Sequence, residues 1–137
     1  MIRFYEEKDY SYVLKLLEEF NNKIDLKANP FYKCFVFEDD IIKGCLVFEE
    51  LYERVELDYI VVDSNYRRCG IGIKLIDYLI DYCMNNNISN ITLEVNENNI
   101  AAQELYKKKG FCVVSKRVGY YNNGDGLLMI RKFDNDE

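Results

Sequence analysis

Apolar and polar residues follow two periods along this chain, and these periods predict an ordered series of strands and helices. Apolar residues alternate with polar ones, or form short apolar runs, over residues 2–5, 33–37, 41–48, 54–62, 91–95, 111–120 and 127–132. Such runs, bounded by turn residues, predict β-strands. Apolar residues recur instead at helical spacing after Asp9, over 73–84 and from Asn98 or Asn99 to Lys109, and these segments predict helices.

The segments between these elements predict turns and caps. Residues 38–40 and 122–126 are polar or glycine-containing and predict hairpins, and 50–53 predicts another turn. Asp9 is the expected cap of the first helix, and Gly110 is the expected C-terminal cap of the last. The apolar stripe expected on the first helix comprises Tyr10, Val13, Leu14, Leu17 and Phe20. Residues 24–32 fit either a short helix or a loop.

The order of these elements is typical of a mixed α/β sheet. One strand and a helical region precede three antiparallel strands, and then a helix, a strand, a helix and two strands follow. Parallel neighbours are expected only where a helix crosses between strands, so most pairs should be antiparallel. No linker rich in proline, glycine or serine divides the chain, and 137 residues suit one core. We therefore expect a single domain over residues 1–137.

Charge excludes some partners. The chain has 24 acidic and 18 basic residues and a net charge of -6, whereas nucleic-acid binding needs a basic face. An acidic protein is compatible with a cationic amine substrate. Three of the acids lie within residues 134–137, a tail that is expected to be frayed.

Cysteine and histidine usage limits the chemistry. The five cysteines form no Cys-x-x-Cys pair and the chain has no histidine, so no metal site is expected. Reduced thiols, and the lack of a signal-like apolar core or a long apolar run, predict a cytoplasmic protein without membrane contact. Without histidine, an enzymatic acid or base must be a carboxylate, tyrosine, lysine, cysteine or water.

A glycine-containing segment joins the strand over 54–62 to the helix over 73–84. Its glycines, Gly70 and Gly72, let a ligand approach the backbone, and the helix start offers unpaired N–H groups. This arrangement predicts a phosphate site. It is not a P-loop, because Lys74 is followed by Leu75, and it lacks the third glycine of the dinucleotide fingerprint. An ordinary strand-to-helix turn is the alternative.

A second pattern lies on the helix that ends at Lys109. Asn99, Ala102 and Tyr106 are spaced by three, four and seven residues, so they share one helix face. The small side chain of Ala102 leaves room for a ligand between the amide of Asn99 and the phenol of Tyr106. The alternative for Tyr106 is a core aromatic residue with its hydroxyl at the surface.

Both patterns resemble signatures of one family. The spacing Arg-x-x-Gly-x-Gly over 67–72 resembles the pyrophosphate loop of the GNAT N-acetyltransferase superfamily. The other signature, Asn-x-x-Ala-x-x-x-Tyr-x-x-x-Gly-Phe, is matched by Asn99, Ala102, Tyr106, Gly110 and Phe111. The resemblance implies the GNAT (acyl-CoA N-acyltransferase) fold, a mixed, mostly antiparallel sheet flanked by helices. It also implies acetyl-CoA as cosubstrate.

The resemblance also implies which residues bind acetyl-CoA. The end of the strand should pair with the pantetheine arm, the loop should hold the pyrophosphate, and Tyr106 should donate a proton to the departing thiolate. The implied cofactor residues are Ile60, Val61, Val62, Arg67, Arg68, Cys69, Gly70, Ile71, Gly72, Ile73, Asn99 and Tyr106. Cys69 is either a reactive thiol at a helix start or a harmless small residue.

Two carboxylates are candidates for the catalytic base. Glu94 and Glu56 lie on predicted strands, and each could instead be a solvated strand carboxylate. The segment Leu93-Glu94-Val95, Tyr106 and the hairpin over 119–125 resemble the bacterial ribosomal-protein N-terminal alanine acetyltransferases, which implies that Glu94 is the base. Tyr59 departs from that branch, which usually has Asn there, and Glu56 corresponds to the glutamate of the histone-acetylating branch.

Three functions stay open at this point. The favoured one is acetyl transfer from acetyl-CoA to a protein N-terminal amine. A small amine, such as a polyamine or an amino sugar, is the first alternative acceptor. A CoA-binding module without turnover is the second. The protein is expected to be a monomer or a homodimer.

Overall fold

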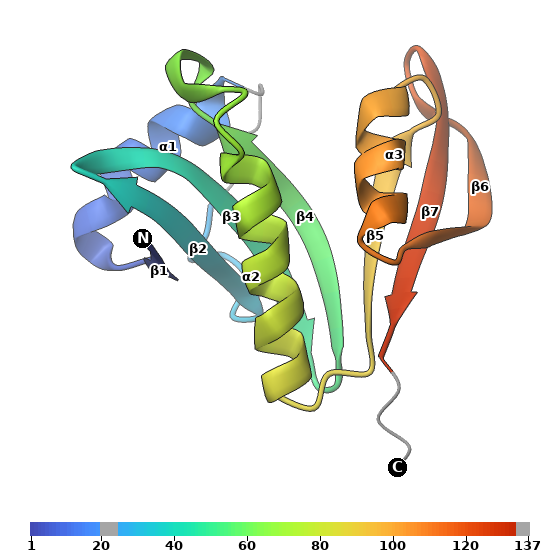
Figure 1. The fold of residues 1–137 in the computed structure, drawn as a ribbon, viewed down its shortest axis with the longest axis horizontal. Coiled ribbons are helices and arrows are strands. Elements are labelled where there is room, and N and C mark those ends of the chain that lie inside the picture. The colour runs from blue at the N-terminus through green and yellow to red at the C-terminus, as the bar shows by residue number, and fades with distance from the viewer. Residues whose placement is uncertain (20–24, 134–137) are drawn as a thin grey trace.

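The computed structural model describes residues 1–19 and 25–133 and contains a sheet flanked by helices (Figure 1). Phe20 and the acidic tail over 134–137 therefore lie outside the described residues. The strands are β1 Ile2–Phe4, β2 Tyr32–Asp39, β3 Ile41–Leu51, β4 Arg54–Val62, β5 Asn90–Asn96, β6 Cys112–Tyr121 and β7 Gly124–Lys132. The helices are α1 Tyr10–Glu18, α2 Ile71–Asn85 and α3 Ile100–Lys108, with 3-10 turns at Glu7–Asp9 and Ser64–Tyr66.

The described strands form one sheet in the order β1-β2-β3-β4-β5-β7-β6. The pair β4–β5 is parallel, and the others are antiparallel. Helix α2 provides the crossover between those two parallel strands (Figure 1). The mixed, mostly antiparallel sheet expected from the sequence is confirmed.

The two parallel strands pair over a short length and then separate. Pairing joins Arg54–Leu57 of β4 to Asn90–Leu93 of β5 and extends no further among the described residues. Beyond it, the facing edges of both strands lose their ladder partners, and Figure 1 shows β4 and β5 diverging toward their carboxyl ends. Unpaired backbone N–H and C=O groups need a partner, so this opening favours an extended ligand.

A β-bulge in β4 changes which residues face the core. Val47 pairs with Tyr59 and Phe48 pairs with Leu57, so Asp58 is the extra residue. Before the bulge, Leu57 packs in the core under α2, whereas after it Ile60 packs there instead. An extra residue reverses the two-residue alternation of a strand. The sequence predicted an unbroken strand over 54–62 and gave no sign of this bulge.

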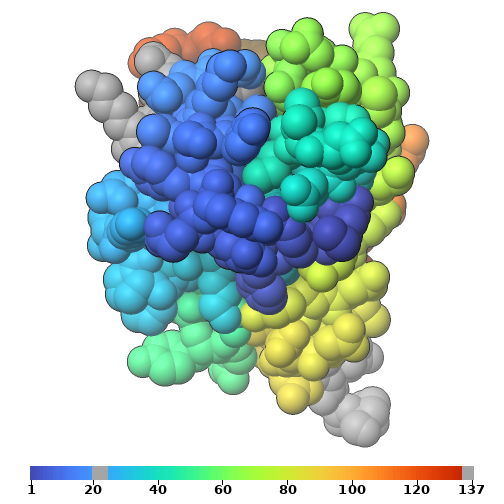
Figure 2. All heavy atoms as spheres, turned by 90° about the vertical axis from the view of Figure 1, so that its left-hand side faces the viewer, coloured from blue at the N-terminus to red at the C-terminus, as the bar shows by residue number. Residues whose placement is uncertain are grey.

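Two apolar cores lie on opposite faces of the sheet. Helices α2 and α3 cover one core, which includes Phe35, Leu75 and Tyr106. Helix α1 covers the other, which includes Val13 and Val36. Figure 2 faces the β1 side and shows the N-terminal residues beside the β2–β3 hairpin and α2.

The first helix differs in detail from the expected one. Tyr10 is 47% exposed, and Leu16, absent from the expected stripe, is buried beside Val13 and Leu17. Asp9 makes no side-chain capping bond to α1; it receives two hydrogen bonds from Arg3, at 2.8 and 3.0 Å, instead. This pairing lowers the pKa of Asp9 and fixes β1 to the start of α1.

Within residues 1–19 and 25–133, the helices lack the combination of length and apolar character that a bilayer crossing requires.

Candidate active site

A cavity of about 560 Å³ opens where β4 and β5 diverge, beside α3. Residues from both strand edges, from the face of α3 and from the end of β6 line it. The lining consists of Glu56, Leu57, Asp58, Tyr59, Ile60, Val61, Glu94, Val95, Asn96, Asn99, Ala102, Tyr106, Tyr120 and Tyr121. Both candidate bases and the candidate acid therefore face one space, although they belong to three different elements.

Tyr106 is fixed by packing and yet keeps a free hydroxyl. Its side chain is 8% exposed, and its ring lies 5.7 Å from that of Phe111. Among the described residues its hydroxyl has no hydrogen-bond partner. Burial raises the pKa of Tyr106, so the phenol stays protonated through the neutral range. A buried ring with an unpaired phenol in a cavity suits a proton donor better than a purely structural aromatic residue.

Glu94 is held by a residue that the sequence did not indicate. Arg117 of β6 forms an ion pair with Glu94, its Nε lying 3.0 Å from Glu94 Oε1, and the Glu94 side chain is 14% exposed. The other oxygen, Oε2, is buried without a hydrogen-bond partner. An anion in this position can accept a proton from a neighbour, directly or through water.

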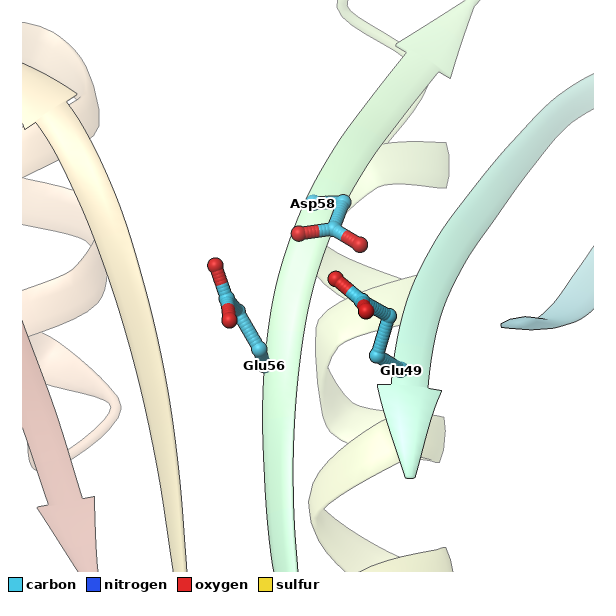
Figure 3. Close-up of side chains that lie close together, drawn as sticks. All are labelled: Glu49, Glu56 and Asp58. Carbon is cyan, nitrogen blue, oxygen red and sulfur yellow. The ribbon is translucent and has the colours of Figure 1, made fainter. Parts of the chain in front are cut away.

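A third carboxylate joins the two on β4. Glu49 of β3 has a carboxylate oxygen within 4.8 Å of those of Glu56 and Asp58. Figure 3 shows the carboxylates of Glu49 and Asp58 pointing toward each other. Sequence reasoning missed Glu49, although the hairpin register, in which Glu49 lies opposite Glu56, could have indicated it. Carboxylates this close repel one another unless a positive charge or a shared proton lies between them.

The protonation of this cluster follows from its crowding. Burial, together with hydrogen bonding and charge from Glu49, raises the pKa of Asp58 to about 8. Partial desolvation, and then the charges of Glu49 and Glu94, also raises the pKa of Glu56, while Arg117 opposes that change. The protonated form of Asp58 is therefore favoured at neutral pH.

Asp58→Asn should remove a pH-dependent loss of stability. Because the pKa of Asp58 rises from 3.8 to about 8 on folding, the native state holds a proton that the unfolded state releases. Stability contributed by this group is therefore present below pH ~4 and is lost as the pH rises through about 8. After allowing for solvent screening, we expect the variant to gain about 1–2 kcal/mol, or roughly 3–8 °C in Tm, at pH 9.

Thermal unfolding of Asp58→Asn at pH 4 and pH 9 provides the measurement. The gain should be small at pH 4, because the native state is then protonated and the unfolded state is close to half protonated. The control is Asp81→Asn, because Asp81 is exposed on α2 and has no ion-pair partner in the described part of the chain. Equal changes in Tm at both pH values would contradict a raised pKa of Asp58.

The glycine loop has the geometry of an open helix start. Gly70 has a positive φ of 78° and no side chain with which to cap α2. The first helical bond that involves it runs from the Lys74 N–H to the Gly70 carbonyl at 3.0 Å. The N–H groups of Ile71, Gly72 and Ile73 precede this bond and point out of the helix end. Helix α2 thus begins two residues earlier than expected, at Ile71.

Gly72 is not required by the packing of the chain itself. A Cβ at this position would meet only Val62 Cγ2, at 3.9 Å, an ordinary contact distance. Gly72 also lacks the positive φ that Gly70 adopts. A glycine that neither conformation nor packing demands is consistent with close approach of a ligand to the backbone.

The remaining predicted cofactor residues lie in different places. Ile60, Val61, Asn99 and Tyr106 line the cavity, whereas Val62 and residues 67–73 lie outside its lining. Arg67 connects the two parts, because its Nε donates to the Val62 carbonyl at 3.3 Å. In the same loop, Arg68 has a positive φ of 67° and Cys69 is exposed.

Asn99 caps α3 and also lines the cavity. Its Oδ1 accepts the Ala102 N–H at 3.1 Å and so caps α3. This confirms the expected cap and leaves the amide nitrogen for other contacts. Gly110, with φ of 91°, follows α3, and its N–H donates to the Lys107 carbonyl at 3.0 Å.

Two diverging parallel strands, an open helix start and a cavity with paired acid and base candidates define the acyl-CoA N-acyltransferase class of fold. Residues 2–111 match the model of the acetyltransferase (GNAT) family. The chain therefore belongs to the GNAT family.

Curated relatives show which members of the GNAT family this chain is similar to. The chain is 34% identical over 80 residues to the [ribosomal protein bS18]-alanine N-acetyltransferase of Escherichia coli (strain K12), covering 58% of this chain and 54% of that protein. It is 36% identical over 93 residues to N-alpha-acetyltransferase 30 of Saccharomyces cerevisiae, covering 64% of this chain and 53% of that one. The chain thus spans about half the length of the curated relatives it matches.

Solved structures agree with this fold. The ribosomal-protein-S18-alanine N-acetyltransferase from Escherichia coli superimposes with a TM-score of 0.87 at 22% identity, covering 100% of this chain and 97% of that one. Arabidopsis thaliana Naa50, in complex with the bisubstrate analogue CoA-Ac-MVNAL, gives a TM-score of 0.81 at 26% identity, covering 97% of this chain and 98% of that one.

Proposed function

We propose that this protein transfers the acetyl group of acetyl-CoA to a primary amine, and that the acceptor is a protein N-terminus. The observation that carries this proposal is the convergence of Glu94 and Tyr106 on one cavity between two unpaired strand edges. A carboxylate and a protonated phenol in the same cavity can accept the proton of the amine and donate a proton to the leaving thiolate.

The proposed step balances its protons. Glu94 first takes one proton from the ammonium form of the acceptor, directly or through water. The neutral nitrogen then attacks the thioester carbonyl carbon, and a C–N bond forms. The C–S bond breaks, and the leaving thiolate takes the hydroxyl proton of Tyr106. Tyr106 regains a proton from the acetylated nitrogen through solvent, and Glu94 releases its proton to solvent, so the products are the acetylated amine, the CoA thiol and one proton. Phenol and thiol pKa values, near 10 and 8.5, are close enough for general acid catalysis.

In the same proposal, the strand edges and the helix start bind acetyl-CoA. The free edge of β4 over Ile60, Val61 and Val62 would pair with the amides of the pantetheine arm. The pyrophosphate would lie at the open start of α2, over residues 67–73. Backbone N–H groups and the helix dipole favour an anion there.

Gly72→Asp should weaken acetyl-CoA binding sharply without unfolding the protein. The added side chain has room, but its carboxylate would repel the pyrophosphate at the helix start. Losing charge-assisted contacts should reduce affinity by about 10–100-fold. Calorimetric titration with acetyl-CoA measures the change, and Gly72→Ala serves as the control because it adds bulk without charge. Unchanged affinity in Gly72→Asp would remove this loop from the cofactor site.

An N-terminal acceptor is supported by charge and by the relatives. Glu56 and Asp58 line the cavity and Glu49 lies beside them, and the net negative charge of this acidic cluster attracts a cationic amine. The curated relatives are named for acetylation of N-terminal residues, and the Naa50 structure holds a bisubstrate analogue of CoA and a peptide. The same acidic cluster would also attract a polyamine or an amino sugar, which remains the alternative acceptor class.

A thiol-release screen tests the proposal. The protein is supplied with acetyl-CoA and a panel of short peptides with free N-termini, blocked peptides containing lysine, polyamines and amino sugars. Thiol release with free N-termini, and a mass gain of one acetyl group on the peptide, is the expected result. Turnover only with polyamines or amino sugars would show that the acceptor is a small amine and not a protein N-terminus. Acetyl-CoA binding without thiol release from any acceptor would identify a binding module instead.

A further inference from the structure

An ion pair joins β5 to β6 across β7, the strand that lies between them in the sheet. Glu94 lies on β5 and Arg117 on β6, and β7 runs between them. Arg117 Nε nevertheless reaches Glu94 Oε1 at 3.0 Å. The residue of β7 opposite Arg117 is Gly126. A Cβ at Gly126 would lie 2.9 Å from Tyr120 Cδ2, so the missing side chain leaves room over β7 for the Tyr120 ring, and the Arg117 guanidinium lies against that ring.

The two oxygens of Glu94 have different surroundings. Oε2 is buried without a partner, and a Cβ at Gly126 would lie only 3.0 Å from it. Oε2 is therefore enclosed against β7, and Oε1 is the oxygen left to meet an acceptor. A carboxylate oxygen has two lone pairs, so Arg117 can occupy one of them and leave the other toward the cavity.

Arg117 has little part in holding the fold together. Its side chain is 58% exposed, and its guanidinium carbon lies 5.3 Å from the ring centre of Tyr120. An ion pair with one partner this exposed adds little to stability. The ionisable groups near Glu94 also include Glu56 of β4 and Tyr121 of β6.

We propose that Arg117 is a positioning residue that fixes the carboxylate of Glu94 for proton transfer, acting on Glu94 Oε1 from across β7. The inference rests on the proposed function, in which Glu94 is the base. Arg117 itself touches neither the acceptor nor acetyl-CoA in this proposal. Its contribution is to hold one rotamer of Glu94, because a misplaced catalytic group costs rate even when its chemistry is intact.

Arg117→Met tests this role, with Arg117→Lys and Lys116→Met beside it. Arg117→Met should lower kcat by about 10–100-fold, the usual cost of losing an orienting partner, with little change in Tm or in KM for acetyl-CoA. Arg117→Lys should recover most of this loss, since an ammonium can still reach Oε1. Lys116→Met is the matched control: Lys116 pairs with Glu97 and Asp125, at 3.6 and 3.5 Å, and not with Glu94.

A double-mutant cycle separates positioning from a merely structural effect. If Arg117 acts through Glu94, then Arg117→Met should cost nothing further in a Glu94→Gln background. Losses that multiply in the double variant would overturn the inference, and so would a kcat of Arg117→Met equal to or above that of the parent. Both results leave acetyl transfer intact, whereas failure of the parent protein to release thiol with any amine would overturn the proposed function and this inference together.

Discussion

Glu94→Gln is expected to lower kcat strongly at pH 7, within the range of about 10²–10⁴-fold that general base catalysis contributes. Glutamine keeps the size of the side chain and can still face Arg117, but it cannot accept the proton of the amine. Glu94 lines the cavity and its carboxylate is held in place, so the loss should fall on kcat and not on acetyl-CoA affinity. Steady-state kinetics with an N-terminal peptide measures the change.

The pH profile of this variant identifies the acceptor. Activity should recover once the pH passes the pKa of the acceptor, because the amine then arrives already neutral. For an N-terminal peptide, recovery should come near pH ~8, whereas a lysine or polyamine acceptor would move it toward pH ~10.

Glu56→Gln is the matched carboxylate variant. Glu56 faces the same cavity and belongs to the acidic cluster, so its loss should raise KM for a cationic amine and leave kcat nearly unchanged. If Glu56→Gln carried the kcat defect and Glu94→Gln did not, Glu56 would be the base. The likeness to N-terminal acetyltransferases would then lose its mechanistic support.

Tyr106→Phe should produce the second large effect, a fall in kcat of about 10²–10⁴-fold. The substitution keeps the ring that packs against Phe111 and deletes the hydroxyl proton that Tyr106 would give to a leaving thiolate. Stopped-flow or steady-state thiol release measures kcat, and calorimetry should find acetyl-CoA affinity nearly intact.

Tyr78→Phe is the control for Tyr106→Phe. Tyr78 lies on α2, is 39% exposed and packs edge-on against Phe35, outside the cavity. The kcat of the Tyr78→Phe variant should equal that of the parent protein. A loss of less than about threefold in Tyr106→Phe would contradict general acid catalysis and assign this tyrosine to core packing.

Local features of the fold were accessible from the sequence because neighbouring residues create them. The cap at Asn99 and the glycine after α3 depend on a few consecutive residues, and both agree with the structure. The α1 stripe was only partly right: Leu16 took a buried place and Tyr10 did not. Helical spacing gives the face of a helix to within a residue or so, and packing against the sheet decides the rest.

The site was predictable as far as residue spacing reaches. Gly70, Gly72, Asn99 and Tyr106 stand at fixed offsets along the chain, and their types are those that the proposed phosphate site and proton donor need. The residues that contact the cavity carboxylates Asp58 and Glu94 could not be predicted from spacing. Glu49 comes to Asp58 through a hairpin register, and Arg117 comes to Glu94 across a strand that follows both of them in the sequence.

The sequence by itself determined the type and order of the elements, the open helix start and the candidate acid and bases. These depend on hydrophobic period, caps and short motifs, which act over a few residues. Only the tertiary structure decided that β4 and β5 separate after Leu57 and Leu93, that β4 bulges at Asp58, and that Arg117 reaches Glu94. Lateral strand neighbours are set by pairing and packing across the whole sheet, and no short stretch of sequence encodes them.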